Sequence, residues 1–392
     1  MFPALARPLT GLALAHAVVF LVFCGWQLNH AHGQILSDGN PIGGDFVNLW
    51  TVGRMVMEGL SAKIYAPERF MELQQDRIGA YIGHRLWAYP PHSLAVAIPF
   101  GVPVYFVSLA MWSLLGLAVL GFGARRAGLN RWTTAFLLAS PASLFCIYWG
   151  QTGNLACGLL LLALSQRNGR DIVAVGASTL LTVKPQLGVL LPVLWLAKRQ
   201  WGIVVSVTLA VAATLACAAA VGGLDLWEAY LFETLPELNR LERYGSGPFV
   251  SMIPSTFMAL RIVTGNGDLA AKLHLVFAAA VLAWLVRTFL HEDRMQTCKA
   301  IVPIATAVIT PYLHVYDLTL VLAGTMMITG PRTAAEDGMT PWNRRAVLAA
   351  WALPYVTLVL NKAGFPIAPA VMLALLVFAV YGTHRQMRIR SA

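Results

Sequence analysis

Apolar runs long enough to cross a lipid bilayer recur along this chain and constrain its fold more than any other feature. The first run, Leu9–Leu28, would form a helix that spans about 30 Å of hydrocarbon. Of the 392 residues, 58% are hydrophobic and only 12% are charged, whereas an ordinary soluble domain carries about 25% charged residues. The sequence therefore predicts an all-α, polytopic membrane protein.

Lys and Arg gather in short loops between these runs, as at Arg125, Arg126, Lys198 and Arg199. By the positive-inside rule such loops face the cytoplasm. The formal net charge of +10 thus reflects membrane topology, and we do not expect nucleic-acid binding. We expect a single domain over residues 1–392, with both termini in the cytoplasm and about twelve membrane-inserted helices, some of them short or re-entrant.

Two long polar segments interrupt the apolar pattern on the outer side. The first outer loop, residues 29–91, contains two amphipathic stretches, Phe46–Gly59 and Ala66–Ile78, which predict helices lying in the membrane interface. Residues 222–267 predict a second long, polar outer loop. The apolar run Trp132–Trp149 predicts one arm of a membrane hairpin.

The candidate functional residues all fall on the outer side of this topology. One lies in the first outer loop and the others at three hairpin tips; they are Asp45, Gln151 and Asn154, Lys184, and His314 with Asp317. An ionisable group at membrane depth is costly and is by default functional or paired. The sequence therefore predicts a polar site at the outer face.

Each of these residues also has a structural explanation. Asp45 follows two glycines before a predicted helix and could cap it. Lys184 could pair with a carboxylate or extend to the lipid headgroups. His314 and Asp317 could form a local pair that closes a helix break, and the two amide side chains could cap facing helices.

No motif for a metal or nucleotide cofactor is present in the sequence. The nine histidines lack metal-ligand spacing, the five cysteines form no CxxC pair, and no glycine-rich phosphate loop follows a strand. We expect no cofactor, and the sequence leaves metal dependence open.

Short motifs in a fixed order resemble glycosyltransferase family 87, a group of mannosyltransferase-like membrane enzymes with a GT-C fold. The resemblance covers residues 40–330, and its motifs are Gly44-Asp45-Phe46, Glu58-Gly59, Ile64-Tyr65, Tyr89-Pro90-Pro91 with Pro99, Gly150-Gln151 with Asn154, Lys184-Pro185-Gln186, and Pro311 with His314, Tyr316 and Asp317-Leu318. Each motif is short, and their order along the chain carries the resemblance.

The resemblance implies a hexosyltransferase that takes a sugar from a polyprenyl-phosphate donor. It implies a glycolipid, glycan or other cell-envelope acceptor and an active site on the outer face of the cell membrane. GT-C enzymes take their general base from the first outer loop, and by position this is Asp45. Direct displacement with a single base would invert the anomeric centre.

A cation should stabilise the phosphate that leaves, and Lys184 is the first choice for it and His314 the second. The resemblance also implies that Gln151, Asn154, Asp317 and Tyr89 bind the donor phosphate or sugar. We expect Asp45, Lys184 and His314 to converge on one outward cavity with a groove that opens to lipid.

Some of these roles have competitors. Glu58, Glu68 and Asp317 are alternative bases. Trp50 and Trp87, like Tyr89, could stack on sugar rings or belong to the interfacial aromatic belt.

The alternative function is a secondary transporter or lipid flippase of a polysaccharide pathway. Transporters hold substrate near the midplane between matched repeats, and this sequence shows neither feature convincingly. A membrane scaffold is a third possibility.

Overall fold

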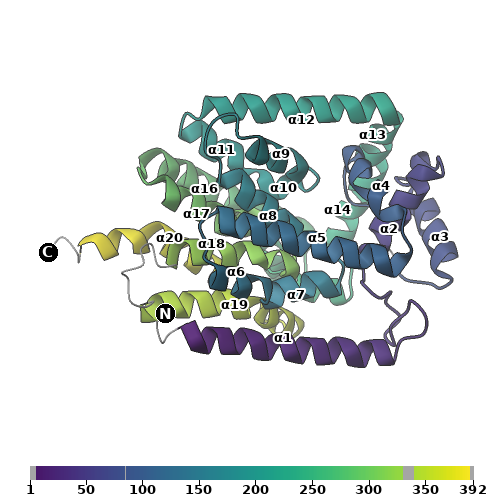
Figure 1. Ribbon diagram of the computed structural model, residues 1–392, viewed down its shortest axis with the longest axis horizontal. Coiled ribbons are helices and arrows are strands. Elements are labelled where there is room, and N and C mark those ends of the chain that lie inside the picture. The colour runs from purple at the N-terminus through teal and green to yellow at the C-terminus, as the bar shows by residue number, and fades with distance from the viewer. Residues whose placement is uncertain (1–5, 84, 330–339, 389–392) are drawn as a thin grey trace.

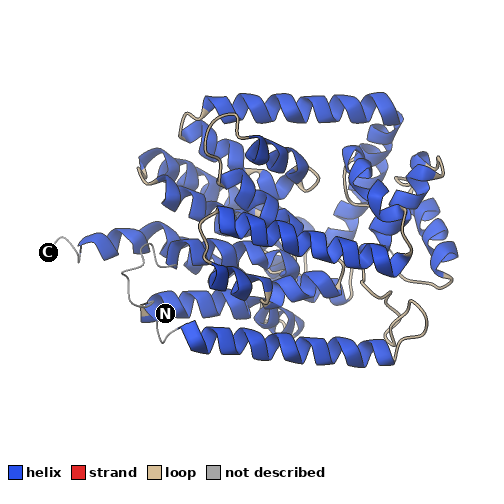
Figure 2. Cartoon of the chain, in the orientation of Figure 1, coloured by secondary structure: helices blue, strands red, loops and turns tan. Residues whose placement is uncertain are grey.

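The computed structural model describes residues 6–83, 85–329 and 340–388, and helices make up most of it (Figure 1, Figure 2). Across these residues the only β-type pairings are two isolated bridges, between His32 and Ile35 and between Ile35 and Pro41. The predicted all-α class is confirmed.

Among the described residues, four helices are long and apolar enough to cross a bilayer. They are α1 (Ala6–Asn29), α5 (Tyr105–Arg126), α12 (Trp201–Gly222) and α16 (Gly267–His291). In Figure 1 the axes of α1, α5 and α12 lie roughly parallel to one another across the molecule. Ile203 is the one buried residue of α12, so much of the surface of this helix is free to face lipid.

Shorter helices fill the space between the long ones. They are α6 (Arg131–Leu138), α7 (Pro141–Tyr148), α8 (Gly153–Leu164), α9 (Ile172–Leu181), α10 (Pro185–Gly188), α11 (Leu190–Ala197), α17 (Met295–Ile309), η5 (Val315–Leu318) and α18 (Thr319–Thr329), with α19 (Pro341–Lys362) and α20 (Ala368–Arg388) beside them. A helix the length of α8 extends only about 18 Å, and its residues are almost all buried. The predicted count of about twelve membrane-inserted helices stays a prediction.

The expected hairpin arm over Trp132–Trp149 is two helices, α6 and α7. The first ends at Leu138. Ser140 caps the second, since its hydroxyl accepts a hydrogen bond from Ser143 N at 3.4 Å, and proline at the next position favours a helix start. Ala139 O at the break hydrogen-bonds to His16 Nδ1 on α1, at 3.2 Å. The break is therefore closed by a side chain from another helix.

The first outer segment contains the two helices expected from its amphipathic stretches. These are α2 (Phe46–Met57) and α3 (Pro67–Ile78), followed by α4 (Leu94–Gly101), with the short turns η1 (Ser61–Lys63) and η2 (Pro91–Ser93). Helix α2 is buried on most sides, because Phe46, Val47 and Val52 are fully covered. It is part of a packed unit with α4 and α5.

The second outer segment contains helices, which the sequence did not predict. It consists of α13 (Asp225–Ala229), the π-helix η3 (Tyr230–Thr234), α14 (Leu235–Tyr244), η4 (Pro248–Met252) and α15 (Thr256–Thr264). Tyr230 packs edge-on against Tyr65 of the first segment at 5.6 Å between ring centroids. Thr234 Oγ1 also donates to Tyr65 O at 3.1 Å. The two outer segments thus form one unit, which sequence periodicity within either segment does not reveal.

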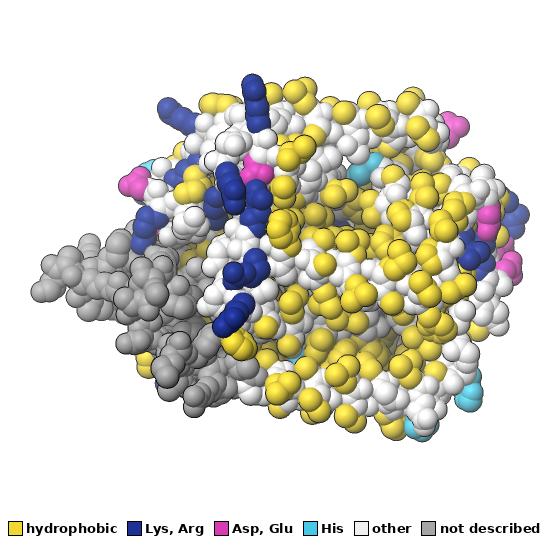
Figure 3. Space-filling model, in the orientation of Figure 1, with side chains coloured by type: hydrophobic (Ala, Val, Ile, Leu, Met, Phe, Trp, Pro, Cys, Tyr) yellow, Lys and Arg dark blue, Asp and Glu magenta, His cyan; other side chains and the backbone are white. Residues whose placement is uncertain are grey.

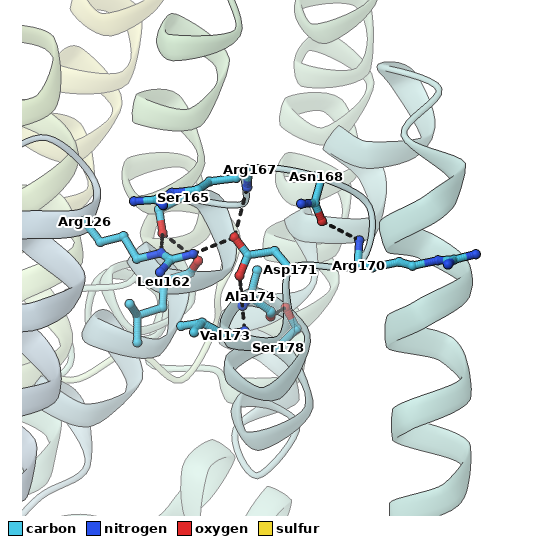
Figure 4. A network of polar contacts seen from close by, with 10 residues as sticks. All are labelled: Arg126, Leu162, Ser165, Arg167, Asn168, Arg170, Asp171, Val173, Ala174 and Ser178. Carbon is cyan, nitrogen blue, oxygen red and sulfur yellow. Dashed lines mark hydrogen bonds and ion pairs between the residues drawn. The ribbon is translucent and has the colours of Figure 1, made fainter.

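A polar network joins helix ends on the opposite side of the molecule (Figure 4). Arg126 at the end of α5 pairs with Asp171 at 2.5 Å and donates to Ser165 Oγ at 3.1 Å. Asp171 also caps α9 by accepting from Val173 N and Ala174 N. The network ties α5, α8 and α9 together where the sequence places its short basic loops.

The surface has the pattern of a membrane protein (Figure 3). Hydrophobic side chains cover the middle of the face shown, and Lys and Arg gather on the side where α1 begins and α20 ends. Charged side chains of both signs reappear at the opposite side, around α3.

Helices α2 and α4 touch backbone to backbone at Gly53 and Gly101. A Cβ atom on Gly53 would lie 2.6 Å from Gly101 N. We expect Gly53→Ala to force the helices apart and to lower stability by about 1–3 kcal/mol, measured as a lower unfolding temperature in detergent. Gly176→Ala is the matched control, because its Cβ would meet nothing within 4 Å; equal shifts in both variants would contradict the prediction.

The second outer segment contains a carboxyl group that should make stability pH-dependent. Burial raises the pKa of Glu242 from 4.5 to about 7, against the opposing charge of Arg261. A carboxyl whose pKa is higher in the folded state stabilises the protein below the unfolded pKa, and that stability is lost as the pH rises to 7. We expect Glu242→Gln to match wild type near pH 4.5 and to unfold at a higher temperature at pH 8, a gain of up to about 3 kcal/mol. A pH-independent difference would refute it.

Candidate active site

The backbone before α2 is fixed to the turn between α7 and α8. Asp45 N donates to Trp149 O at 3.0 Å. Gly44 has φ +50°, and a Cβ there would lie 2.8 Å from the Trp149 ring, so glycine allows this close approach. Tyr105 of α5 holds the loop from the other side, donating to Ile42 O at 2.7 Å. Three segments distant in sequence therefore place Asp45.

The carboxylate of Asp45 joins two side chains. Its Oδ1 forms an ion pair with Arg85, and its Oδ2 accepts from Gln151 Nε2 at 2.6 Å. It makes no side-chain capping bond to α2, so the capping explanation is wrong. The Asp45 side chain is still 41% exposed, which leaves it open to a further ligand.

Arg85 is the residue that sequence reasoning missed. It comes from the loop between α3 and η2 and is only 11% exposed at its side chain. Cations in long outer loops are not informative under the positive-inside rule, and nothing in the local sequence distinguishes Arg85 from the others. Its pairing with Asp45 appears only in three dimensions.

Lys184 and Asp317 form a second, more deeply buried pair. Lys184 Nζ lies 3.2 Å from Asp317 Oδ1, and the side chains are 11% and 2% exposed. Asp317 Oδ2 also accepts from His314 N at 3.3 Å. Burial disfavours the charged amine, but the carboxylate of Asp317 outweighs it, so the pKa of Lys184 lies above its usual value. The structure therefore contains the pairing of Lys184 with a carboxylate and the local pair of His314 with Asp317, which forms through the His314 backbone.

His314 and Tyr89 belong to the same electrostatic neighbourhood. Burial lowers the pKa of His314, while the carboxylates of Asp317 and Asp45 oppose that shift and Lys184 adds to it. Burial raises the pKa of Tyr89, and Lys184 opposes it. The charges of Asp45 and Lys184 thus both act on these two side chains.

An aromatic ring packs beside Lys184 and His314. The rings of His314 and Tyr316 stack at 5.0 Å between centroids with planes 5° apart, and Lys184 Nζ lies 5.5 Å from the Tyr316 ring centroid. The Tyr89 hydroxyl lies 3.3 Å from Thr152 Oγ1, at the start of α8. The Lys184 contact connects the Lys184 loop with the His314 loop, and the Tyr89 contact connects the segment before η2 with the start of α8.

Other candidates from the sequence lie elsewhere. Asn154 Nδ2 donates to Ser143 O at 3.1 Å, so this side chain joins α8 to α7. Glu58 pairs with Arg77. The indoles of Trp50 and Trp87 are buried, at 7% and 2% exposure, and offer no open face for a sugar. Over the described residues, no group of three or more His, Cys, Asp or Glu could hold a metal ion.

Lys184 and Asp317 should be strongly coupled in their effects on the stability of the protein. Removing one partner leaves an unmatched buried charge, which costs about 3–5 kcal/mol. We expect Lys184→Met to lower the unfolding temperature sharply and the added Asp317→Asn change to recover part of the loss. Lys362→Met, at an exposed lysine, is the control. Strictly additive effects of the two substitutions would show that the pair does not act as a unit.

Comparison with known proteins identifies the family. A family model described as Glycosyltransferase family 87 matches residues 87–311, which is more than half of the chain. The match contains Tyr89, Gln151 and Lys184, and it begins after Asp45 and ends before His314. No curated protein and no solved structure matches the chain. The chain belongs to glycosyltransferase family 87 and is a membrane glycosyltransferase.

Proposed function

We propose that the protein transfers a hexose, of the mannosyl type, from a polyprenyl-phosphate donor to a cell-envelope acceptor. Asp45 is the general base, and the anomeric centre is inverted. The proposal rests on the environment of the Asp45 carboxylate. Arg85 and Gln151 each bond one of its oxygens, and yet the side chain is 41% exposed. A base must combine a fixed position with access to the acceptor hydroxyl.

In the proposed step, the acceptor oxygen attacks the anomeric carbon as Asp45 takes its proton. The bond from that carbon to the phosphate oxygen breaks, and the phosphate leaves with the electron pair and an added negative charge. Lys184 uses one of its three N–H groups for Asp317, so it keeps donors for a phosphate oxygen. His314, in the same loop as Asp317, supplies a further hydrogen-bonding group.

Lipid access is part of the same proposal. In Figure 3 the apolar face is hollowed between α12 and α5, and Ile203 is the one buried residue of α12, so much of the surface of this helix is free. A lipid chain could lie in that hollow with its phosphate toward Lys184. The proposed topology keeps both termini in the cytoplasm and this site on the outer face, in a GT-C-like arrangement.

A transfer assay tests the base. With purified protein in detergent, a radiolabelled polyprenyl-phosphate hexose and an acceptor extract, we expect Asp45→Asn to slow transfer by about 10²–10⁴-fold, the usual contribution of a general base. Asp38→Asn is the matched control, since that carboxylate is exposed in the same segment and bonds only to Asn40 N among the described contacts.

Two outcomes would overturn the proposal. Transfer at the wild-type rate in Asp45→Asn would remove Asp45 as the base. Movement of the lipid-linked sugar across sealed vesicles with no transfer to any acceptor would favour a transporter or flippase.

A further inference from the structure

We infer that Arg85 is a positioning residue that fixes the orientation of the Asp45 carboxylate, with Gln151 holding its other oxygen. The inference rests on the proposed role of Asp45 as the base. Arg85 adds to that role the contact that makes the base effective, and it lies outside the range matched by the family model.

Arg85 is held on three sides. Its Nε donates to Ile82 O at 2.9 Å, its Nη2 donates to Asn40 Oδ1 at 2.9 Å, and its Nη1 pairs with Asp45. Two of these partners belong to the segment before α2 and one to the loop of Arg85 itself. The guanidinium therefore has a fixed place and can serve as a reference point for the carboxylate.

Asp45 is held at both oxygens by residues far apart in sequence. Arg85 binds Oδ1 from 40 positions away, and Gln151 binds Oδ2 from 106 positions away. With both oxygens bonded, the carboxylate cannot rotate freely about its terminal bond. A carboxylate accepts about four hydrogen bonds, so lone pairs remain for an acceptor hydroxyl.

Burial separates positioning from substrate binding. The Arg85 side chain is 11% exposed, whereas that of Asp45 is 41% exposed. An approaching substrate therefore meets the carboxylate before the guanidinium. Lys184 pairs with a different carboxylate, Asp317, so Arg85 is the cation assigned to the base.

The chemistry also requires arginine at this position. Lysine has the same charge but is a point donor on a flexible stem, and it cannot bond Ile82 O, Asn40 and Asp45 from one rigid plane. Lysine would keep the charge beside Asp45 and lose the orientation. A small displacement of a catalytic group can cost about 10²-fold in rate.

The test uses Arg85→Lys and Arg85→Gln in the full-length protein, with kcat and the KM for the polyprenyl-phosphate sugar measured separately. We expect both variants to lose about 10²-fold in kcat with the donor KM changed less than about threefold. Arg77→Lys is the matched control, because Arg77 forms an ion pair with Glu58 in the same outer segment, and we expect near wild-type kcat from it.

Chemical rescue gives a second readout. In Arg85→Ala, added guanidinium ion should restore part of kcat by occupying the vacated place, and it should restore nothing in Asp45→Asn. The unfolding temperature of each variant shows whether it is folded. If Arg85→Ala does not fold, Arg85→Lys replaces it in the kinetic test, because lysine keeps the charge and most of the side-chain volume.

The outcomes separate this inference from the proposed function. Wild-type kcat in Arg85→Lys would show that charge alone suffices and would overturn the positioning role. A large rise in donor KM at constant kcat would overturn it in favour of donor binding. Either result leaves Asp45 as the base if Asp45→Asn is inactive, whereas an active Asp45→Asn would refute the proposed function itself.

Discussion

Several central helices are too short to cross a bilayer, and the polar site depends on this constraint. Where a helix stops at membrane depth, its backbone groups need partners within the protein, since hydrocarbon provides none. Here Trp149 O accepts from Asp45 N, and Gly150 O accepts from the indole of Trp112 at 3.1 Å. One of the contacts that close the end of α7, from Asp45 N to Trp149 O, thus also places Asp45.

The sequence was sufficient to predict the helical class and the family, because these depend on apolar periodicity and on short ordered motifs. It also indicated which turns carry polar residues, including those of Lys184 and Asp317, which form an ion pair. It did not predict the helices of residues 222–267, because their apolar side chains, such as Tyr230, face the first outer segment and form no long run. Arg85 was missed for a related reason, since its partner Asp45 lies 40 positions away.

The two ion pairs differ in burial, and this difference suits them to different tasks. The pair of Lys184 with Asp317 is nearly enclosed, at 11% and 2% exposure, and Asp317 also closes a turn by accepting from His314 N. In the pair of Arg85 with Asp45 the carboxylate is the open partner, at 41% exposure. A closed pair is suited to hold structure and a fixed charge, and an open one to exchange a proton with substrate.

Charge balance connects the two pairs under the proposed mechanism. In the free protein each cation is matched by a carboxylate, which limits the cost of keeping four charges in a poorly solvated place. During transfer the phosphate gains a negative charge while Asp45 gains a proton and becomes neutral. Arg85 then has no ionised partner at the moment when the phosphate needs compensation. The total charge of the site and its substrates stays constant through the step, because the proton lost by the acceptor remains on Asp45. Low-dielectric surroundings therefore strengthen the interactions between the site's charges and the substrates, and no added charge has to be buried.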